Sequence, residues 1–504
     1  MSTDHGRPRA TAFGRGLALS VSIGVGVGGA GADGPTIAPD HHLSANDALP
    51  YDGLGYGLAI DGNRMLAGAR GSDSVSLNGG VVYTYARGAS GWTQAAKVIF
   101  PTAVANDQVG TSIAMSGSVG IAGAPNRSGT GAAFSLRFDG GAWYPTNELT
   151  DPSAGEGARF GASTAASATR LVVGAPNSAE GVGAGAGRVR VFDLNGVQWI
   201  LGQLIRAPFI DPNDQFGFAI AIDGEWLAIS APGDDDRAIN SGAVFVYRVV
   251  AGAFVLAHKL FAPTSISEDS FGQSVALKDG LLVIGAPRRD DAGNGAGAAY
   301  VFSVPANGST PTLERTLLPP AGSVDAEFGF AVSTDGVSVV VGAPGFNVAG
   351  SLRGGAWIYF DGSAQSSAVM ARSVDGMQLL GTRVAITSVD VVASIPAASS
   401  GAMPGAGLIA VVDRTRDCNT NSVPDSIDIG AGTVLDLNND GIPDQCQCLV
   451  DLNGDHVING IELSTILANW GAVPAGTSGD LDGDGFVGGV DLATVLTAWG
   501  PCQN

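Results

Sequence analysis

Two stretches near the C-terminus place oxygen-bearing side chains at the spacing that calcium coordination requires. In a twelve-position loop, ligand positions 1, 3, 5, 9 and 12 hold side-chain oxygens and position 7 offers its backbone carbonyl: Asp451, Asn453, Asp455, Asn459, Glu462 and, at position 7, Val457. A second loop repeats the pattern with Asp480, Asp482, Asp484, Asp491 and the carbonyl of Phe486. Calcium prefers about six to eight such oxygen ligands. The pattern therefore predicts two Ca²⁺ sites of the EF-hand type.

The two loops differ at the position that needs a sharp turn. Gly485 occupies position 6 of the second loop, whereas His456 stands there in the first. Because glycine adopts the required backbone conformation most easily, we expect the first site to be the weaker one. Gly488 occupies position 9 of the second loop, so a water molecule would replace that side chain.

Each loop is followed by an apolar pattern typical of a short helix. Four apolar residues of the first unit recur 29 residues later in the second, at i, i+3, i+4 and i+7: Leu463, Ile466, Leu467 and Trp470, then Leu492, Val495, Leu496 and Trp499. Gly471 and Gly500 are expected to end the helices. Neither helix can bury its apolar face alone, so we expect the two units to pack together.

Two further acidic stretches precede this pair. Their oxygen-bearing residues alternate, with a fourth carboxylate four positions on: Asp417, Asn419, Asn421 and Asp425, then Asp436, Asn438, Asp440 and Asp444. Each set could surround one hard cation. Asx turns in a linker are the alternative interpretation.

All four cysteines lie in this last fifth of the chain: Cys418, Cys446, Cys448 and Cys502. An even number in a small region of an exported protein favours disulfides. The sequence does not determine the pairing, although Cys418 with Cys446 and Cys448 with Cys502 would each bracket one repeat region. Zinc is the rival interpretation, but Cys-x-x-Cys pairs do not occur.

The larger part of the chain repeats one motif seven times. Its copies align at Tyr56-Gly57, Val109-Gly110, Phe160-Gly161, Phe216-Gly217, Phe271-Gly272, Phe328-Gly329 and Leu380-Gly381. Gly-Ala-Pro follows in register at 123–125, 174–176, 285–287 and 342–344, with variants at Gly68-Ala69-Arg70 and Ser230-Ala231-Pro232 and a degenerate copy at Ser394-Ile395-Pro396. A period of about 50 residues built from short apolar runs and glycine turns predicts a β-propeller.

The repeats also indicate how the ring closes. Before most Phe-Gly motifs stands a short strand that ends near proline, as in Leu260-Phe261-Ala262-Pro263. Thr36-Ile37-Ala38-Pro39 has the same form, and the seventh repeat stops after Leu408 to Val412 without one. We therefore predict that an N-terminal strand completes the last blade.

These motifs resemble the FG-GAP repeats of integrin α-chain propellers over about residues 35–413, which implies a seven-bladed β-propeller. No complete integrin-type calcium loop occurs inside the repeats. Residues 414–447 resemble thrombospondin-type calcium repeats. Residues 448–504 are similar to a type I dockerin, a calcium-dependent module that binds cohesin receptors. That family recognises its partner through loop positions 10 and 11, here Gly460-Ile461 and Gly489-Val490, which are not the familiar hydroxyl-bearing pairs, so cohesin specificity does not carry over.

Composition sets the remaining bounds. The 504 residues include 76 glycines, are 45% hydrophobic and carry a formal charge of −21. Such acidity argues against nucleic acid as a partner. Residues 1–32 have the basic start, apolar stretch and small-residue end of a secretory signal, and no later segment is apolar enough for a membrane span. We expect a mainly β protein that is secreted or held at the cell surface: a propeller, a calcium-binding spacer and a small module of two loop-helix units.

The motifs searched for contain no catalytic set. Histidines are few, and the elbow, zinc-helix and P-loop patterns do not occur. Asp234-Asp235-Asp236 and Asp290-Asp291 are the carboxylates hardest to dismiss, because a glycosidase needs only two. The leading hypothesis is a non-enzymatic binding or adhesion protein, with a protein or glycan ligand on the propeller and a protein partner, such as a cohesin-like receptor, on the tail. The alternatives are a component of a polysaccharide-degrading system, including an O-glycosyl hydrolase, a structural surface repeat protein, and a tail that is only a disulfide-stapled cap.

Overall fold

The computed structural model covers the propeller with short gaps and parts of the C-terminal segment. It describes residues 36–37, 41–88, 91–181, 183–209, 211–320, 323–348, 351–352, 354–359, 368–370, 379–401, 403–415, 425, 434, 450, 452, 457–473, 478–481 and 485–501. Seven of the eight predicted ligands in the linker region lie outside these residues, as do all four cysteines. The seven are Asp417, Asn419, Asn421, Asp436, Asn438, Asp440 and Asp444.

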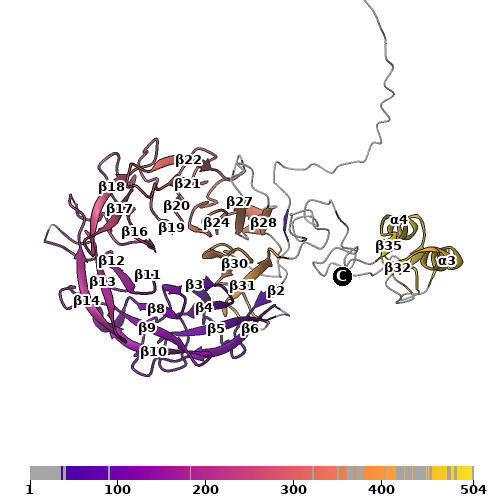
Figure 1. Ribbon diagram of the computed structural model, residues 1–504, viewed down its shortest axis with the longest axis horizontal. Helices are drawn as coiled ribbons and strands as arrows, with labels where there is room; N and C mark the ends of the chain where they lie inside the picture. The colour runs from indigo at the N-terminus through magenta and orange to yellow at the C-terminus, as the bar shows by residue number, and fades with distance from the viewer. Residues whose placement is uncertain are drawn as a thin grey trace, which may run out of the picture.

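Seven antiparallel sheets form a ring (Figure 1), which confirms the predicted seven-bladed propeller. The first four blades comprise β3 (Leu54–Asp61), β4 (Arg64–Ala69), β5 (Val81–Gly88) and β6 (Gly91–Val98); β7 (Ile113–Ser116), β8 (Val119–Ala124), β9 (Ala132–Asp139) and β10 (Ala142–Leu149); β11 (Ser163–Ala166), β12 (Arg170–Ala175), β13 (Arg188–Asn195) and β14 (Gln198–Ile205); and β15 (Ile220–Asp223), β16 (Trp226–Ala231), β17 (Ala243–Val250) and β18 (Ala253–Leu260).

The last three blades comprise β19 (Ser274–Lys278), β20 (Leu281–Ala286), β21 (Ala298–Ser303) and β22 (Thr312–Leu317); β23 (Ala331–Thr334), β24 (Val339–Ala343), β27 (Gly355–Tyr359) and β28 (Ala368–Met370); and β29 (Val384–Ile386), β30 (Asp390–Ile395) and β31 (Leu408–Asp413) with an N-terminal strand. A small hairpin, β25 (Asn347–Val348) and β26 (Ser351–Leu352), follows β24, and a short 3-10 turn spans Arg127–Gly129. In each blade the first strand lies innermost, and first strands of neighbouring blades contact one another around the ring.

The core lies between neighbouring sheets, not within one of them. Each buried cluster combines residues of two consecutive blades, as where Val191 of the third blade and Ile229 of the fourth belong to one cluster. The motif phenylalanines Phe160, Phe216, Phe271 and Phe328 are fully buried. Phe216, for example, contacts the Phe245 ring edge-on at 5.3 Å between centroids. Apolar runs such as Leu282-Val283-Ile284 are therefore covered on both faces, as their composition requires.

An N-terminal strand closes the ring, as predicted, but the segment differs from the expected one. The strand β2 (His41–Leu43) pairs antiparallel with β31 and completes the seventh blade. Thr36–Ile37, the start of the segment named from the sequence, forms β1 and pairs in parallel with β28 of the sixth blade. The pattern before the proline thus identified an outer strand correctly and assigned it to the wrong sheet.

The first copy of the motif is Leu54-Gly55, so the alignment at Tyr56-Gly57 was wrong by two residues. Gly55 has φ +96°, like Gly110 at +90° and Gly272 at +97°. The Leu54 amide donates to the Ala406 carbonyl, just as the Phe160 amide donates to the Thr130 carbonyl of the preceding blade. The repeats were aligned at Tyr56-Gly57 because Tyr56 is aromatic, as is the residue before glycine in most other copies. The backbone conformation of the glycine, however, defines the motif.

Glycine is required where neighbouring blades meet. The Phe-Gly glycine of one blade lies against the Gly-Ala-Pro glycine of the blade before it: a Cβ on Gly68, Gly123, Gly174, Gly285 or Gly342 would overlap the carbonyl oxygen of Gly110, Gly161, Gly217, Gly329 or Gly381, respectively. The two motifs that recur in the sequence are thus the two sides of a single contact.

Serine hydroxyls complete this contact in two alternative ways. Ser163 and Ser274, on first strands, and Ser112, directly before one, donate to the carbonyls of Gly217, Gly329 and Gly161 in the next blade at 2.6–2.9 Å. Where the second strand has serine in place of the glycine, the hydroxyl accepts from a first-strand amide instead: Ser230 from Ala219 at 2.9 Å and Ser394 from Arg383 at 3.0 Å.

The C-terminal part contains two short helices, α3 (Gly460–Ala468) and α4 (Gly489–Thr497), which pack against each other (Figure 1). Short strands of the two units pair with each other: β32 (Val457–Ile458) pairs with β35 (Gly500–Pro501), and β33 (Gly471–Ala472) pairs with β34 (Phe486–Val487). Their shared core contains Ile458, Ile466, Val487 and Val495. Among the described residues no helix is long and apolar enough to cross a membrane.

Replacing Gly123 with alanine tests the contact between blades. The added methyl group would meet the Gly161 carbonyl and the Ser112 hydroxyl, so we expect the free energy of unfolding to fall by about 1–3 kcal/mol, the usual cost of overpacking. Gly155→Ala is the matched control, because nothing lies within 4 Å of its Cβ position. Urea unfolding measures both variants, and a wild-type midpoint for Gly123→Ala would contradict the model of the contact.

Candidate functional site

Six of the predicted calcium ligands lie in the part of the C-terminal module that the structure describes. Val457, Asn459, Glu462, Asp480, Phe486 and Asp491 are among the described residues. Asp451, Asn453, Asp455, Asp482 and Asp484 lie outside them. Within the described part of the chain no three acidic, histidine or cysteine side chains converge as a metal cluster. The test of these ligands therefore rests on the atoms of the residues that are described.

In the first loop, Glu462 combines a helix cap with one unused oxygen. The Asn459 side chain accepts from the Ile461 amide at 2.9 Å, and Glu462 Oε2 accepts from the Asn459 amide at 2.7 Å. This capping box fixes the start of α3. Glu462 is fully buried, yet its Oε1 has no hydrogen-bond partner among the described residues. A buried carboxylate oxygen without a partner is costly, and a cation would satisfy it.

In the second loop, Asp480 and Asp491 are held by backbone amides. Asp480 Oδ2 accepts from Gly485 at 3.1 Å, while its Oδ1 is buried without a hydrogen-bond partner in the part of the chain that the structure describes. Asp491 is 1% exposed and accepts from Leu481 and Gly488, both at 2.7 Å. Gly485, at position 6, has φ +83°, as the sharp turn requires. The donor set and the two unsatisfied oxygens fit a hard cation such as Ca²⁺.

The exposed residues of the two helices carry no charge. Glu462 and Asp491, the charged residues of α3 and α4, are both buried. The exposed apolar side chains match between the units: Ile461 and Val490, Leu467 and Leu496, and Trp470 and Trp499, all 49–56% exposed. Only part of the predicted apolar stripe is therefore in the core, which corrects the expectation that packing of the two units would cover it.

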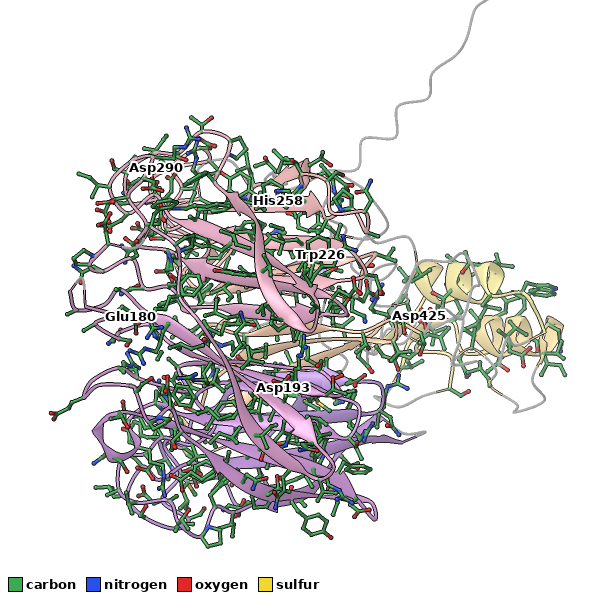
Figure 2. The ribbon with its side chains drawn as sticks, turned by 60° about the vertical axis from the view of Figure 1, so that its left-hand side comes forward. Glu180, Asp193, Trp226, His258, Asp290 and Asp425 are labelled. Atoms are coloured by element: carbon green, nitrogen blue, oxygen red, sulfur yellow. The ribbon has the colours of Figure 1, made fainter. Side chains whose placement is uncertain are left out.

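On the propeller, acidic and basic side chains gather at the turns that follow the second strands, here called the loop face. Figure 2 shows Glu180 and Asp290 on this side and Trp226 toward the opposite side. Asp107 and Asp269, each two residues before a Phe-Gly position, accept from Arg127 at 2.6 Å and from Arg289 at 2.8 Å. These arginines stand two residues after the prolines of the Gly-Ala-Pro motifs, so the ion pair is part of the repeat.

In the fourth blade an aspartate replaces the arginine of this ion pair. Asp214 occupies the position of Asp107, but Asp234 stands where the arginine would be. Lys259 pairs instead with Asp234 at 2.5 Å and with Asp236 at 2.6 Å. Asp214 is 4% exposed and accepts from the Asp211 amide at 2.8 Å. Burial raises the pKa of Asp214 to about 6, and the negative charge of Asp234 adds to the rise.

The carboxylates considered as a catalytic pair are engaged in these contacts. Asp234 and Asp236 share Lys259, and Asp291 accepts from Arg289 at 2.8 Å. Asp290 accepts from the Gly295 amide at 2.8 Å. The central channel, of about 960 Å³, is lined largely by aliphatic side chains such as Leu58, Ile113 and Ile220. These contacts fit structural roles for the carboxylates in their loops.

The sequence analysis missed the ion pairs of the loop face. A signal was present, because an aspartate two residues before Phe-Gly and an arginine two residues after the proline occur together in the second and fifth repeats. Comparing the repeats for matched charges, not only for apolar residues, would have found both the pair and its reversal at Asp214.

Asp214→Asn should stabilise the protein at neutral pH. A folded-state pKa above the unfolded value of 3.8 means that the contribution of Asp214 to stability falls as pH rises from about 4 to about 6. The amide removes that cost while keeping an acceptor for Asp211, so we expect a gain of up to about 3 kcal/mol at pH 7.5 and little change at pH 4. Thermal unfolding at both pH values measures it.

Asp107→Asn is the matched control for this experiment. It leaves Arg127 without the buried one of its two acidic partners, so it should destabilise the protein at pH 7.5. Destabilisation by Asp214→Asn at pH 7.5 would show that the charged form of Asp214 is compensated, and would contradict the raised pKa.

Comparison with known proteins identifies the repeats. A family model described as "FG-GAP repeat" matches residues 40–85, 205–247 and 254–302. No curated protein sequence matches the chain. Two solved structures are similar at low identity: a protein assigned as a 6-phosphogluconolactonase from Bacteroides uniformis (TM-score 0.44, 13% identity, 64% of this chain and 86% of that one) and the mitotic checkpoint complex (TM-score 0.43, 14% identity, 77% and 99%). The chain thus contains FG-GAP repeats, and its seven blades form a β-propeller.

Proposed function

We propose that this chain is a secreted or cell-surface binding protein whose propeller presents ligand-binding loops and whose C-terminal module binds Ca²⁺ and a protein partner. The observation that carries the calcium part is the pair of unsatisfied oxygens, Glu462 Oε1 and Asp480 Oδ1. They occupy positions 12 and 1 of the two loops, where carboxylates coordinate the cation.

The charge of the segment supports a bound cation. Beyond Arg416 the sequence contains 13 aspartates and glutamates and neither lysine nor arginine. Such one-sided charge opposes compaction through self-repulsion. Two or more Ca²⁺ ions would offset much of it, so the fold of the module and its calcium loading should be linked.

The exposed apolar side chains of the two loop-helix units support the partner-binding role. Six large apolar side chains, two of them tryptophans, are about half exposed on a module whose buried core has few residues. Exposed apolar patches on small modules mark interaction surfaces, and tryptophan is enriched at interface hot spots. The acidic charge of the C-terminal segment favours a partner with an apolar surface and a basic rim.

Glu462→Gln should weaken calcium binding by the full-length protein. The amide can still accept from Asn459 but offers no negative oxygen to the cation, so we expect the affinity of the first loop to fall roughly tenfold or more. Asp491→Asn tests the second loop in the same way. Asp139→Asn, at an exposed ion pair of the propeller, is the control.

Calorimetric titration with CaCl2 and far-ultraviolet circular dichroism measure these effects. Wild-type protein should bind calcium with a gain of helix signal. Absence of calcium binding by the wild type, or titration curves of Glu462→Gln and Asp491→Asn that match it, would overturn the calcium role.

Ile461→Glu combined with Val490→Glu should abolish partner binding without affecting calcium titration. Both side chains are exposed in the first helical turns, where glutamate is compatible with the helix dipole. Surface plasmon resonance against a panel of cohesin modules, in calcium and in EDTA, measures the effect. Val197→Glu, at a residue of the propeller that is 74% exposed, is the control. No calcium-dependent binding to any cohesin would rule out a cohesin-like receptor.

A further inference from the structure

The innermost strands line the central channel with tiers of equivalent residues (Figure 1). A tier takes one residue from each blade, at a fixed number of positions after the motif glycine. The tier three positions on is aliphatic apart from one threonine: Leu58, Ile113, Thr164, Ile220, Val275, Val332 and Val384. The next tier is small throughout: Ala59, Ala114, Ala165, Ala221, Ala276, Ser333 and Ala385.

Two further tiers complete the wall. The tier five positions after the glycine again carries mostly larger side chains: Ile60, Met115, Ala166, Ile222, Leu277, Thr334 and Ile386. The last tier forms a polar rim at the end opposite the loop face: Asp61, Ser116, Ser167, Asp223, Lys278, Asp335 and Thr387, all of which except Ser167 line the channel. From the loop face to the rim the wall is therefore large, small, large and then polar.

The innermost strands also offer unused backbone groups. Each first strand stands at the end of its sheet and pairs on one side only, with the second strand of its blade. No described strand pairs with the other edge, so alternate N–H and carbonyl groups lack a strand partner there. An alkyl chain in the channel would cover these groups without forming hydrogen bonds, which is costly. A ligand with amide groups of its own would satisfy them.

The rim leaves one carboxylate for a ligand cation. Asp223 pairs with Lys278 at 3.1 Å, and Asp335 pairs with Arg414 at 2.6 Å. Asp61 is partly exposed and has no ion pair with any residue that the structure describes. A positively charged group that reaches the rim therefore finds its partner in Asp61.

We propose that the channel binds an extended peptide segment, with a basic residue of that segment at the rim beside Asp61. Four strand residues of about 3.3 Å each give a wall about 13 Å long, which matches four extended ligand residues. The channel volume of about 960 Å³ is that of a ligand-binding cavity. The amides of the segment pair with the free strand edges, as in β-strand addition.

The tiers also specify the ligand side chains. Counted inward from the basic residue at the rim, they should be small, large and small, because the facing tiers are large, small and large. The site lies inside the ring, so it depends neither on the propeller loops nor on the calcium module.

Calorimetric titration of the full-length protein with synthetic tetrapeptides tests the site. The probe is acetyl-Lys-Ala-Val-Ala-amide. One analogue has glutamate in place of the lysine, and another has N-methylated amide nitrogens, which cannot donate hydrogen bonds. Octylamine tests whether an alkyl chain with an ammonium group is sufficient. We expect saturable binding of the probe and roughly tenfold or weaker binding of each of the other three compounds.

Two variants test the location. Asp61→Asn keeps an acceptor for the Gly117 amide but removes the charge, so it should weaken probe binding about fivefold. Ser333→Leu adds bulk to the small tier and should weaken binding roughly tenfold or more. Asp139→Asn, at an exposed ion pair, and Ser309→Leu, at an exposed serine, are the matched controls and should bind the probe as the wild type does.

Each outcome decides the proposal. Weaker binding of all three analogues, together with weaker probe binding by both variants, supports it. No saturable binding of the probe would overturn it, as would equal affinity for the glutamate peptide, the methylated peptide or octylamine. Wild-type affinity in either variant would place the ligand outside the channel and overturn it as well. If Ser333→Leu fails to fold, the affinity of Asp61→Asn decides.

Discussion

The fold depends on one close approach between backbones. Where two blades meet, a glycine of one lies against a glycine carbonyl of the next, and a methyl group at the contact would displace the sheets. Glycine is costly in a strand because it loses more conformational freedom on folding than other residues do. Its recurrence at these positions therefore marks the contact that sets the spacing of the blades, and the large apolar side chains then fill the space so defined.

The same contact separates what must recur from what is free to vary. Inside the seams the repeats keep glycine, small residues and a buried aromatic or aliphatic side chain. The loops that leave the seams change charge from blade to blade. The Asp107–Arg127 pair and the reversed pattern around Asp214 occupy equivalent positions on one backbone. A ring of this kind can present different chemistry in each sector while its core stays the same, which is what a binding scaffold requires.

The architecture was predictable from sequence because it rests on spacing. Seven copies, their strands and closure by an N-terminal strand all follow from the repeat. The details that depend on backbone conformation did not: Leu54-Gly55 lacks the aromatic residue that guided the alignment, and His41–Leu43 carries no proline signal. In the tail, the position of Glu462 in the loop predicted a calcium ligand but not the helix cap that the structure shows. The exposure of Trp470 and Trp499 was not predicted either, because apolar periodicity cannot tell a core from an interface. Contacts between distant residues, such as Arg87 with Asp390, have no local pattern at all.

The pairing of β2 with β31 has a consequence for how the chain is made. Its two strands are separated by almost the whole propeller, so β2 has no partner during synthesis until the last repeat has followed it. Each intermediate blade can form in turn against the one before, but the ring stays open at one seam throughout synthesis. Closure is then a single late event that joins the two ends of the propeller, and a chain cut short before residue 413 would leave the edge of its last blade exposed to other chains.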